Sequence, residues 1–508
     1  MKKIPVNRNI IAAVSIISFI ILLFTGTAYA LPKDKPGAPS GGESCGGCHA
    51  VFDAEMKAGS AVEENYDTVV IGGGLSGLAA LYYLGSGNNL LLESESGIGG
   101  QMKYDTWKDK KFAAGTSYCG EPYGIVKSFF KDNKIELKKI GDNDSTAWID
   151  GKFYRECWGD GISDKMPWSG NDAKIWKNFL EEIEKTGERD KANLPLEGFD
   201  EKIMMLDNIT ALEYMRKKGL TKEMIDHINL YVRSCFGEPA DKISAGAFIS
   251  FISGDIISTY TVEGGMGAAI SGLADRMKDR IRTSSTVTGV MDDGDRVTII
   301  YRGPGGKTHI IKADTVIMAV ASRHLPKLVK GLPAEKKRVI SEISYASYIV
   351  GAVLCKEVFW EDKGYDMSVS GAFFTDVIDA DWISRGGKAH VNRRVPHVLS
   401  VYIPMGAAGR GDVMAGNTAI WKEKAIADIE KIVPGCRDKI EDVRFYRFGH
   451  SMHVPAPGFL SDIVRILRRP FGRIFFAGVE TEGLPCVEAA VIAGHRAVSE
   501  LNKYLDEK

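Results

Sequence analysis

The sequence predicts an α/β protein with a Rossmann-like dinucleotide-binding domain and a further, mixed α+β domain. The first observation is a β-branched run, Tyr66–Ile71, that leads into the glycine-rich segment Gly72–Gly77 and then into a helix-forming run, 78–84. The second is an acidic residue, Glu93, which ends a second predicted strand 21 residues after the first glycine. The third is the length of 508 residues, which favours about two to four domains over a single core.

Composition and charge exclude several classes of protein. With 44% hydrophobic and 26% charged residues, the chain has the proportions of a folded globular protein. It carries 65 basic and 66 acidic residues, so it offers no broad positive surface to nucleic acid. Its eight cysteines are too few for a disulfide scaffold. We therefore expect no nucleic-acid partner.

The first 30 residues have the pattern of a secretory signal. Basic residues precede an apolar run, 10–24, and the small-residue triplet Ala28–Ala30 follows at the spacing of a signal-peptidase site. The run of 15 residues is shorter than the roughly 20 that a membrane-spanning helix needs. We predict a cleaved signal peptide over 1–30 and a periplasmic protein, with membrane attachment only if the signal is uncleaved.

A haem attachment motif, Cys45-Gly46-Gly47-Cys48-His49, lies within the next segment, 31–65. Two thiols three positions apart can join the two vinyl groups of one haem, and the following imidazole can ligate the iron. Cys45 and Cys48 are thus predicted to hold haem c, with His49 as the metal ligand. The alternatives are a redox disulfide between the two cysteines and half of a zinc site, although a second C-x-x-C pair is absent. The composition of 51–64 favours a helix, in which Met56 is one candidate for the sixth ligand.

The glycines after the first strand have the spacing of a dinucleotide site. Gly72 permits the tight turn, Gly74 lets a pyrophosphate approach the backbone, and Gly77 lets helix and strand pack closely. Glu93 stands where a carboxylate binds the adenosine ribose. The alternative, an incidental glycine turn, does not account for the agreement of strand, helix and acid.

The residues after Glu93, Gly97-Ile98-Gly99-Gly100-Gln101, resemble the E-x(5)-G-G extension of the flavin-containing amine oxidoreductase family, which includes monoamine oxidases, phytoene desaturases and protoporphyrinogen oxidases. The resemblance recurs in family order as far as Leu505, at Gly264–Met266, Lys356–Trp360, Pro457–Gly458, Gly472–Gly478, Glu480–Thr481 and Val487–Ala490. It implies FAD as the cofactor. A helix beginning near Val487 would direct backbone N–H groups at the N1/O2 edge of the flavin.

The resemblance also implies a set of cofactor-binding residues and a division into domains. The implied FAD-binding residues are Gly72, Gly74, Gly77, Glu93, Gly99, Gly100, Gln101, Val287, Gly478, Glu480 and Val487. The implied FAD domain is woven from 66–135, 256–325 and 446–508, and the substrate domain from 136–255 and 326–445.

Three departures from the monoamine oxidase pattern bear on the substrate. Val350 replaces a lysine that holds a water near flavin N5, and Ser451 and Cys486 stand where those oxidases have the two rings of an aromatic cage. His450 aligns with the cysteine that tethers the flavin. We take His450, His453 and Cys486 as candidate catalytic residues, although a histidine in such a place is as often a structural hydrogen bonder. Asp381, Trp382 and Tyr348 are further candidates for the substrate pocket, with core packing as the alternative.

These observations predict an exported FAD- and haem c-containing dehydrogenase. The chain contains one G-x-G-x-x-G only, so NAD(P)H is not the expected electron donor. We expect a small organic substrate, first of all an amine, and electron transfer through the haem to a cytochrome or quinone-linked acceptor. One alternative is an FAD-dependent desaturase, isomerase or protoporphyrinogen-type oxidase acting on an apolar substrate. Another is a non-catalytic electron-transfer component.

Overall fold

The computed structural model describes residues 63–140, 145–155, 166–190, 201–255, 259–360, 364–388 and 390–508. The predicted signal peptide and the haem motif, with Cys45, Cys48 and His49, lie outside the described residues. Glu63 and Glu64, which we expected to end a helix, instead begin strand β1 (Glu63–Ile71). No helix within the described ranges combines the length and apolarity that a membrane span requires.

The first sheet is built around β1. This strand pairs in parallel with β2 (Asn89–Leu92) on one side and with β13 (Thr308–Met318) on the other. Its last residues, Val69 to Ile71, are buried, as expected for a β-branched strand covered on both faces. The carboxyl ends of these three parallel strands therefore meet at one edge, which is where open α/β sheets bind ligands.

The outer strands of this sheet come from distant parts of the chain. The strand order is β10-β2-β1-β13-β12-β11, and β19 pairs in parallel with β13. Their bounds are β10 Ile281–Arg282, β11 Thr286–Asp292, β12 Val297–Arg302 and β19 Ile474–Phe476. The sheet thus joins three segments that are separated by long insertions.

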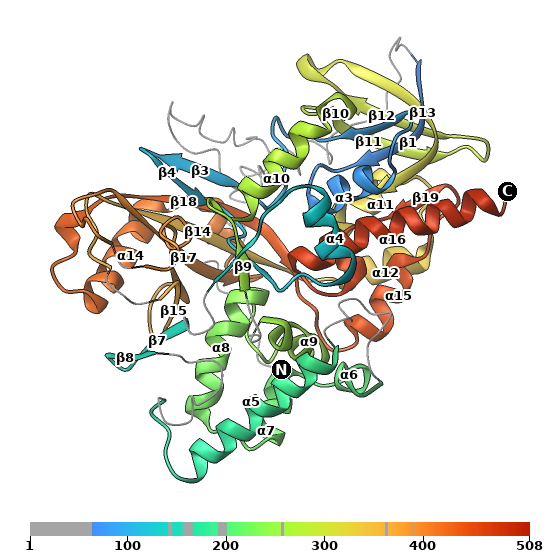
Figure 1. Ribbon diagram of the computed structural model, residues 1–508. Helices are drawn as coiled ribbons and strands as arrows, with labels where there is room; N and C mark the ends of the chain where they lie inside the picture. The colour runs from blue at the N-terminus through green and yellow to red at the C-terminus, as the bar shows by residue number, and fades with distance from the viewer. Residues whose placement is uncertain are drawn as a thin grey trace, which may run out of the picture. The chain divides into compact units, whose positions relative to one another are not determined.

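Helices α3 (Leu75–Tyr83) and α16 (Val487–Asp506) pack against each other beside this sheet (Figure 1). The close approach depends on Gly494, where a Cβ would lie 2.6 Å from the carbonyl oxygen of Ser76. The neighbouring helices are α4 (Gly124–Asp132) and α10 (Gly265–Arg276). The amino-terminal ends of α3 and α16 both reach the carboxyl edge of the sheet.

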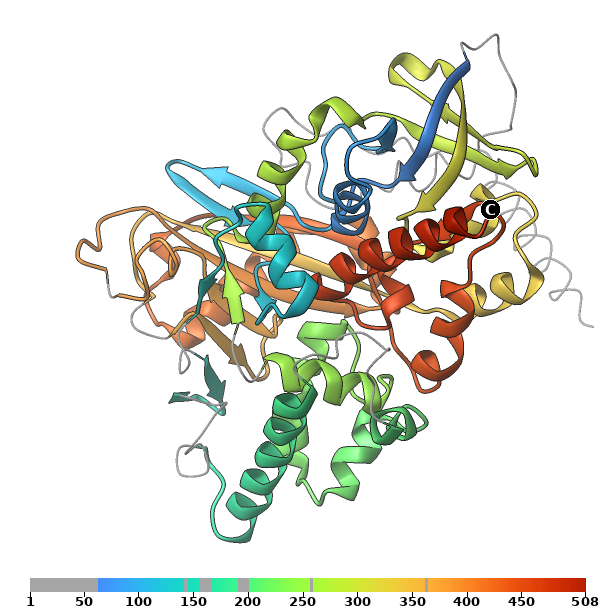
Figure 2. The same ribbon diagram turned by 45° about the vertical axis from the view of Figure 1, so that its right-hand side comes forward.

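The second sheet is mainly antiparallel, with the order β18-β14-β17-β16-β15-β7-β8. Its strands are β18 Ile440–His453, β14 Tyr345–Cys355, β17 His397–Gly406, β16 Asp376–Asp379, β15 Asp366–Val369, β7 Ser145–Ile149 and β8 Lys152–Arg155. Every residue of β14 is buried. This sheet lies beside the first one, and β18 leads from it back toward the Rossmann-like half (Figures 1 and 2).

The remaining helices are distributed over both sheets. A group drawn in green gathers below the second sheet in Figure 2 and comprises α5 Asn171–Asp190, α6 Glu201–Leu206, α7 Ala211–Lys217, α8 Lys222–Phe236 and α9 Ala245–Asp255. The other helices are α11 Leu325–Leu328, α12 Ala334–Glu342, α13 Arg410–Ala415, α14 Thr418–Ile432 and α15 Val464–Arg468. The minor strands are β3 Tyr104–Trp107, β4 Lys110–Ala113, β5 Cys119–Gly120, β6 Lys138–Lys139 and β9 Thr259–Thr261. The predicted mixed α/β fold is confirmed.

Candidate active site

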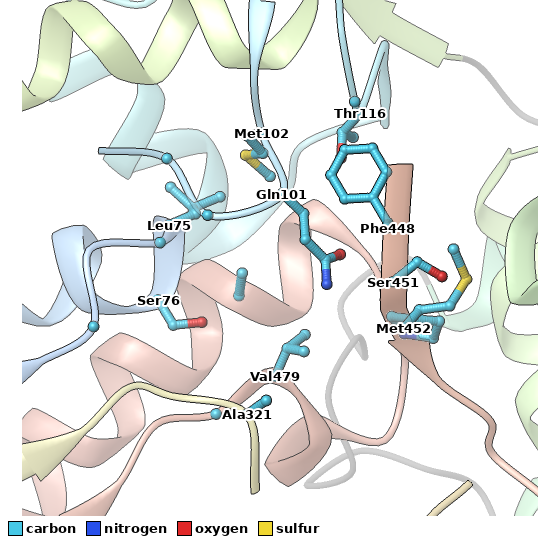
Figure 3. Close-up of a pocket in the computed structure, with 18 of the residues that line it drawn as sticks. Leu75, Ser76, Gln101, Met102, Thr116, Ala321, Phe448, Ser451, Met452 and Val479 are labelled. Atoms are coloured by element: carbon cyan, nitrogen blue, oxygen red, sulfur yellow. The ribbon is translucent and has the colours of Figure 1, made fainter. Parts of the chain in front are cut away.

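A large cavity lies where the two sheets meet, with a volume of about 440 Å³. Its walls come from the glycine-rich turn after β1, the segments 99–102 and 115–120, strands β14 and β18, and the segment that leads into α16. Figure 3 shows Leu75 and Ser76 on one side, with Phe448, Ser451 and Met452 of β18 on the other. Parts of both halves of the molecule therefore build a single site.

The glycine-rich turn can be formed only by glycines at two of its positions. Gly72 has φ +110°, and a Cβ there would lie 2.4 Å from the carbonyl oxygen of Ala319. A Cβ on Gly77 would lie 1.9 Å from the carbonyl oxygen of Gly72. Gly74 differs, because no atom of the chain lies within 4 Å of the position its Cβ would occupy. The chain is thus tightly packed against Gly72 and Gly77, whereas the space beside Gly74 is open.

Gly74 is also the N-cap residue of α3, and no side chain caps this helix. The first N–H groups of a helix have no partner within the helix and attract anions. The open space in front of Gly74 and the uncapped helix together fit a pyrophosphate.

Glu93 follows β2 and is nearly buried, with 9% exposure. Its Oε2 accepts a hydrogen bond of 2.6 Å from the backbone N–H of Gly73, and its Oε1 accepts one of 2.7 Å from that of Glu95. The carboxylate therefore also braces the glycine-rich turn, in addition to the ribose contact that the sequence predicts.

The extension after Glu93 closes over the turn. Gly99 donates a backbone hydrogen bond of 2.9 Å to Gly73, and Gly99 and Gly100 have φ +122° and +56°. Gln101 extends into the cavity in Figure 3, and its Nε2 lies 3.4 Å from the carbonyl oxygen of His450 on β18. This contact joins the segment after Glu93 to β18, on the opposite side of the cavity.

Most of the predicted cofactor-binding residues line the cavity. These are Gly72, Gly74, Glu93, Gly99, Gly100, Gln101, Val287, Gly478, Glu480 and Val487. Gly77 does not line the cavity. It allows helix α3 to approach the carbonyl oxygen of Gly72 closely. The binding roles themselves stay predictions.

The amino terminus of α16 opens into the cavity. Its N-cap residue is Cys486, with φ −128° and ψ 170°, and no side chain caps the helix. Glu488, in the first turn, is buried, and burial raises the pKa of its carboxyl. Its Oε1 has no hydrogen-bond partner among the described residues. An uncapped helix terminus with a buried acid fits the polar edge of a flavin.

The candidate catalytic residues His450, His453 and Cys486 all lie in the wall of the cavity. The ring of His453 stacks on Phe459 with centroids 5.1 Å apart, and burial lowers the pKa of His453. His453 is therefore neutral near pH 7. The ring of His450 meets that of Tyr345 edge to face at 6.1 Å.

Most of the aromatic wall could not be foreseen from the sequence. Tyr118, Phe251, Tyr345, Tyr402 and Phe448 line the cavity together with the predicted Tyr348. The rings of Tyr348 and Tyr402 meet edge to face, with centroids 5.7 Å apart. Ser451 and Cys486, which stand where monoamine oxidases have their aromatic cage, carry no ring. Aromatic side chains from other positions line the cavity instead. Asp381 and Trp382, which we considered for the pocket, are not among the described residues that line it.

Hydrogen bonds hold the two tyrosines in place. Tyr348 Oη donates to the carbonyl oxygen of Ser234 at 3.1 Å. Tyr402 Oη accepts from the backbone N–H of Ser117 at 3.1 Å and donates to its Oγ at 2.7 Å. Burial raises the pKa of both phenols, so both are uncharged. Tyr348 and Tyr402 each lie within an apolar run of the sequence, but only the pairing of β14 with β17 brings them together.

The fold and the site are those expected of a flavoprotein oxidoreductase: a Rossmann-type turn, a carboxylate that braces this turn, and a helix terminus that opens into an aromatic cavity. The profile described as flavin containing amine oxidoreductase matches residues 75–502. The chain belongs to that family.

Members of the family are similar in sequence to this chain over most of its length. An amine oxidase [flavin-containing] of Danio rerio is 25% identical over 474 residues, covering 86% of this chain and 85% of the relative. An L-amino-acid oxidase of Protobothrops flavoviridis is 25% identical over 473 residues, covering 86% and 88%.

Solved structures share the fold. Wild-type putrescine oxidase bound to putrescine has a TM-score of 0.69 at 17% identity, covering 87% of this chain and 100% of that one. Cyclohexylamine oxidase from Brevibacterium oxydans IH-35A has a TM-score of 0.69 at 16% identity, covering 87% and 99%.

Proposed function

We propose that this chain is an exported amine dehydrogenase that binds FAD in the cavity and carries haem c at Cys45 and Cys48, with His49 on the iron. The observation that carries the amine assignment is the cavity itself, in which an aromatic wall faces an intact dinucleotide motif. The names of the relatives, amine oxidases and L-amino-acid oxidases, support the same substrate class.

The residues of the chain have distinct tasks in this proposal. FAD, when bound, supplies a two-electron acceptor for a hydride from the carbon next to the amine nitrogen. The rings of Tyr348 and Tyr402 confine the substrate and exclude water. Phe448 extends this apolar wall along β18 (Figure 3). Burial lowers the pKa of His453, so this side chain adds no positive charge that would repel a protonated amine.

The haem gives the electrons a way out that does not require oxygen. A haem accepts one electron at a time, so two oxidations of the haem are needed for each amine. The motif stands in the same chain as the flavin site, 23 residues before Gly72. The final acceptor in this proposal is a soluble cytochrome or a quinone-linked protein in the periplasm.

Anaerobic stopped-flow spectroscopy of the haem-loaded, exported protein tests the proposal. Mixing with monoamines, diamines and L-amino acids should bleach the flavin absorbance, and the reduced haem bands should follow. Flavin reduction with a haem that stays oxidised would disprove the relay. A failure of every amine and amino acid to bleach the flavin would disprove the substrate class and favour the apolar-substrate alternative.

The matched variant is Cys48→Ser. It should keep the flavin and its reduction by the amine while losing covalent haem, seen as loss of haem staining on a denaturing gel. The protein should then reduce a small artificial dye but not a cytochrome. Unchanged cytochrome reduction by the variant would show that the electrons take another path.

A further inference from the structure

A second polar cluster lies at the end of β16, on residues that do not line the flavin cavity. Asp379 ends β16, and His397 begins the neighbouring strand β17. Their side chains are 2% and 0% exposed. Arg385 and His390 come from the connection between the two strands. The proposed amine oxidation makes no use of this cluster.

The hydrogen bonds assign the tautomer of His397. Its Nδ1 lies 3.1 Å from Oδ2 of Asp381, so Nδ1 carries the proton and donates it to this carboxylate. The Nε2 of a neutral imidazole that donates through Nδ1 has a free lone pair. This Nε2 is buried and has no hydrogen-bond partner among the described residues. Oδ1 of Asp379, 3.9 Å away, is itself an acceptor.

His390 also directs a lone pair into the cluster. Its Nε2 lies 2.8 Å from Nη1 of Arg385, and a guanidinium can only donate. Nη2 of the same guanidinium donates to Oδ2 of Asp379 at 2.8 Å. One ligand atom each from Asp379, His390 and His397 lie within 4.8 Å of one another. The carboxylate of Asp379 and the two imidazole rings therefore converge, with a cationic side chain among them.

We propose that this cluster is a binding site for a divalent transition metal ion of the zinc class. Asp379, His390 and His397 are the ligands, and water completes the coordination. Imidazole nitrogen and carboxylate oxygen are ligands that zinc takes in proteins. Asp381 supplies the carboxylate that orients a metal-bound histidine through its other nitrogen. Arg385 is the cation that neutralises Asp379 when no metal is bound.

The geometry requires only a modest contraction. Ligand atoms about 2.1 Å from a tetrahedral ion lie roughly 3.4 Å apart, so a separation of 4.8 Å must shorten by about 1.4 Å. Asp379 and His397 are held by paired strands, whereas His390 is partly exposed and lies on the connection. Movement of His390 closes the site as Arg385, which is 15% exposed, turns to solvent. The metal then fastens this connection to β17, the strand that carries Tyr402.

Calorimetric titration of the purified holoprotein with zinc chloride, after dialysis against a chelator, tests the proposal. His390→Ala should weaken one zinc site per chain by about 30-fold or more. Arg385→Gln should tighten the same site by about threefold or more, because the competing guanidinium is gone. Comparison with the parent protein cancels any zinc held at the amino-terminal cysteines.

His309→Ala is the control, because its ring stacks on Tyr301 in the first sheet and lies outside the cluster. It should leave zinc affinity unchanged. The melting temperature without metal should be the same within about 3 °C for His390→Ala and His309→Ala, since neither removes a core side chain. It should fall in Arg385→Gln, because the buried carboxylate of Asp379 loses its counter-ion. An unchanged zinc affinity in His390→Ala, or a weaker one in Arg385→Gln, would overturn the proposal.

Discussion

Tyr345 Oη donates a hydrogen bond of 2.6 Å to Oε1 of Glu480 inside the wall of the flavin cavity. Both side chains are buried, and Oε1 also accepts the backbone N–H of Ser322 at 3.0 Å. Tyr345 begins β14 of the second sheet, whereas Glu480 follows β19 of the first. The pair thus fastens the substrate half of the molecule to the flavin half, at the point where the reaction is proposed to occur.

Tyr345→Phe should lower the free energy of unfolding by about 1–3 kcal/mol, because a buried carboxylate loses its hydroxyl donor. Chemical denaturation of the variant measures this change. Glu480→Gln in the same protein gives the double-mutant cycle, and the two effects should sum to more than that of the double variant. Strict additivity would show that the pair does not couple the two sheets. Tyr348→Phe, whose hydroxyl meets only a carbonyl oxygen, is the matched control.

The glycine-rich turn gives a prediction with an internal control. Gly77→Ala should destabilise the protein by about 2 kcal/mol or more, because the new methyl group would overlap the carbonyl oxygen of Gly72. Gly74→Ala meets no atom of the chain, so the flavin-free protein should keep its melting temperature. Its methyl group instead enters the space assigned to the pyrophosphate, and FAD retention on gel filtration should fall. Full flavin retention in Gly74→Ala would place the phosphates elsewhere.

Features of the site that are set by adjacent residues could be predicted from the sequence, whereas contacts between distant strands could not. The turn at Gly72 was predictable because its conformation depends on neighbouring residues, and the start of α16 at Val487 was predictable from the family resemblance. The aromatic wall was not, because Tyr348 and Tyr402 meet only through the pairing of β14 with β17. Asp379 and His397 of the proposed metal site are likewise brought together by the pairing of β16 with β17, and His390 by the connection between these strands. No motif of fixed spacing announces either arrangement.

The aromatic wall should govern substrate affinity. Tyr348→Ala removes one face of the Tyr348–Tyr402 pair and should raise KM for a small amine by about tenfold or more, since a buried ring contact is lost. Tyr348→Phe keeps the ring and should leave KM within about threefold. Anaerobic dye-linked kinetics at saturating flavin measure both. Equal KM values for the alanine variant and the parent would place the amine away from this wall.

Lys336 gives a prediction for pH. Its side chain is buried, and its Nζ donates to the carbonyl oxygens of Ile466 and Leu467, at 2.7 Å each. Burial, with Arg496 as the next cause, lowers its pKa to about 7 from an ordinary value of 10.5. Between these pH values the unfolded chain binds the proton and the folded one does not, so this lysine makes stability rise with pH. Below pH 7 both states are protonated, and the full destabilising effect remains.

The stability of the parent relative to Lys336→Met should therefore increase by about 2 kcal/mol between pH 7 and pH 9. Urea denaturation of both proteins at the two pH values measures this, and the subtraction removes all other titrating groups. The two bonds to the end of α15 and the ring of Phe476, 4.0 Å from Nζ, favour the charged form. If they outweigh burial, the folded protein keeps the proton, and the difference between the two proteins will not change with pH. A flat difference would thus show that Lys336 acts as a charged cap of the helix, whereas a rising one identifies it as a neutral amine in the folded state.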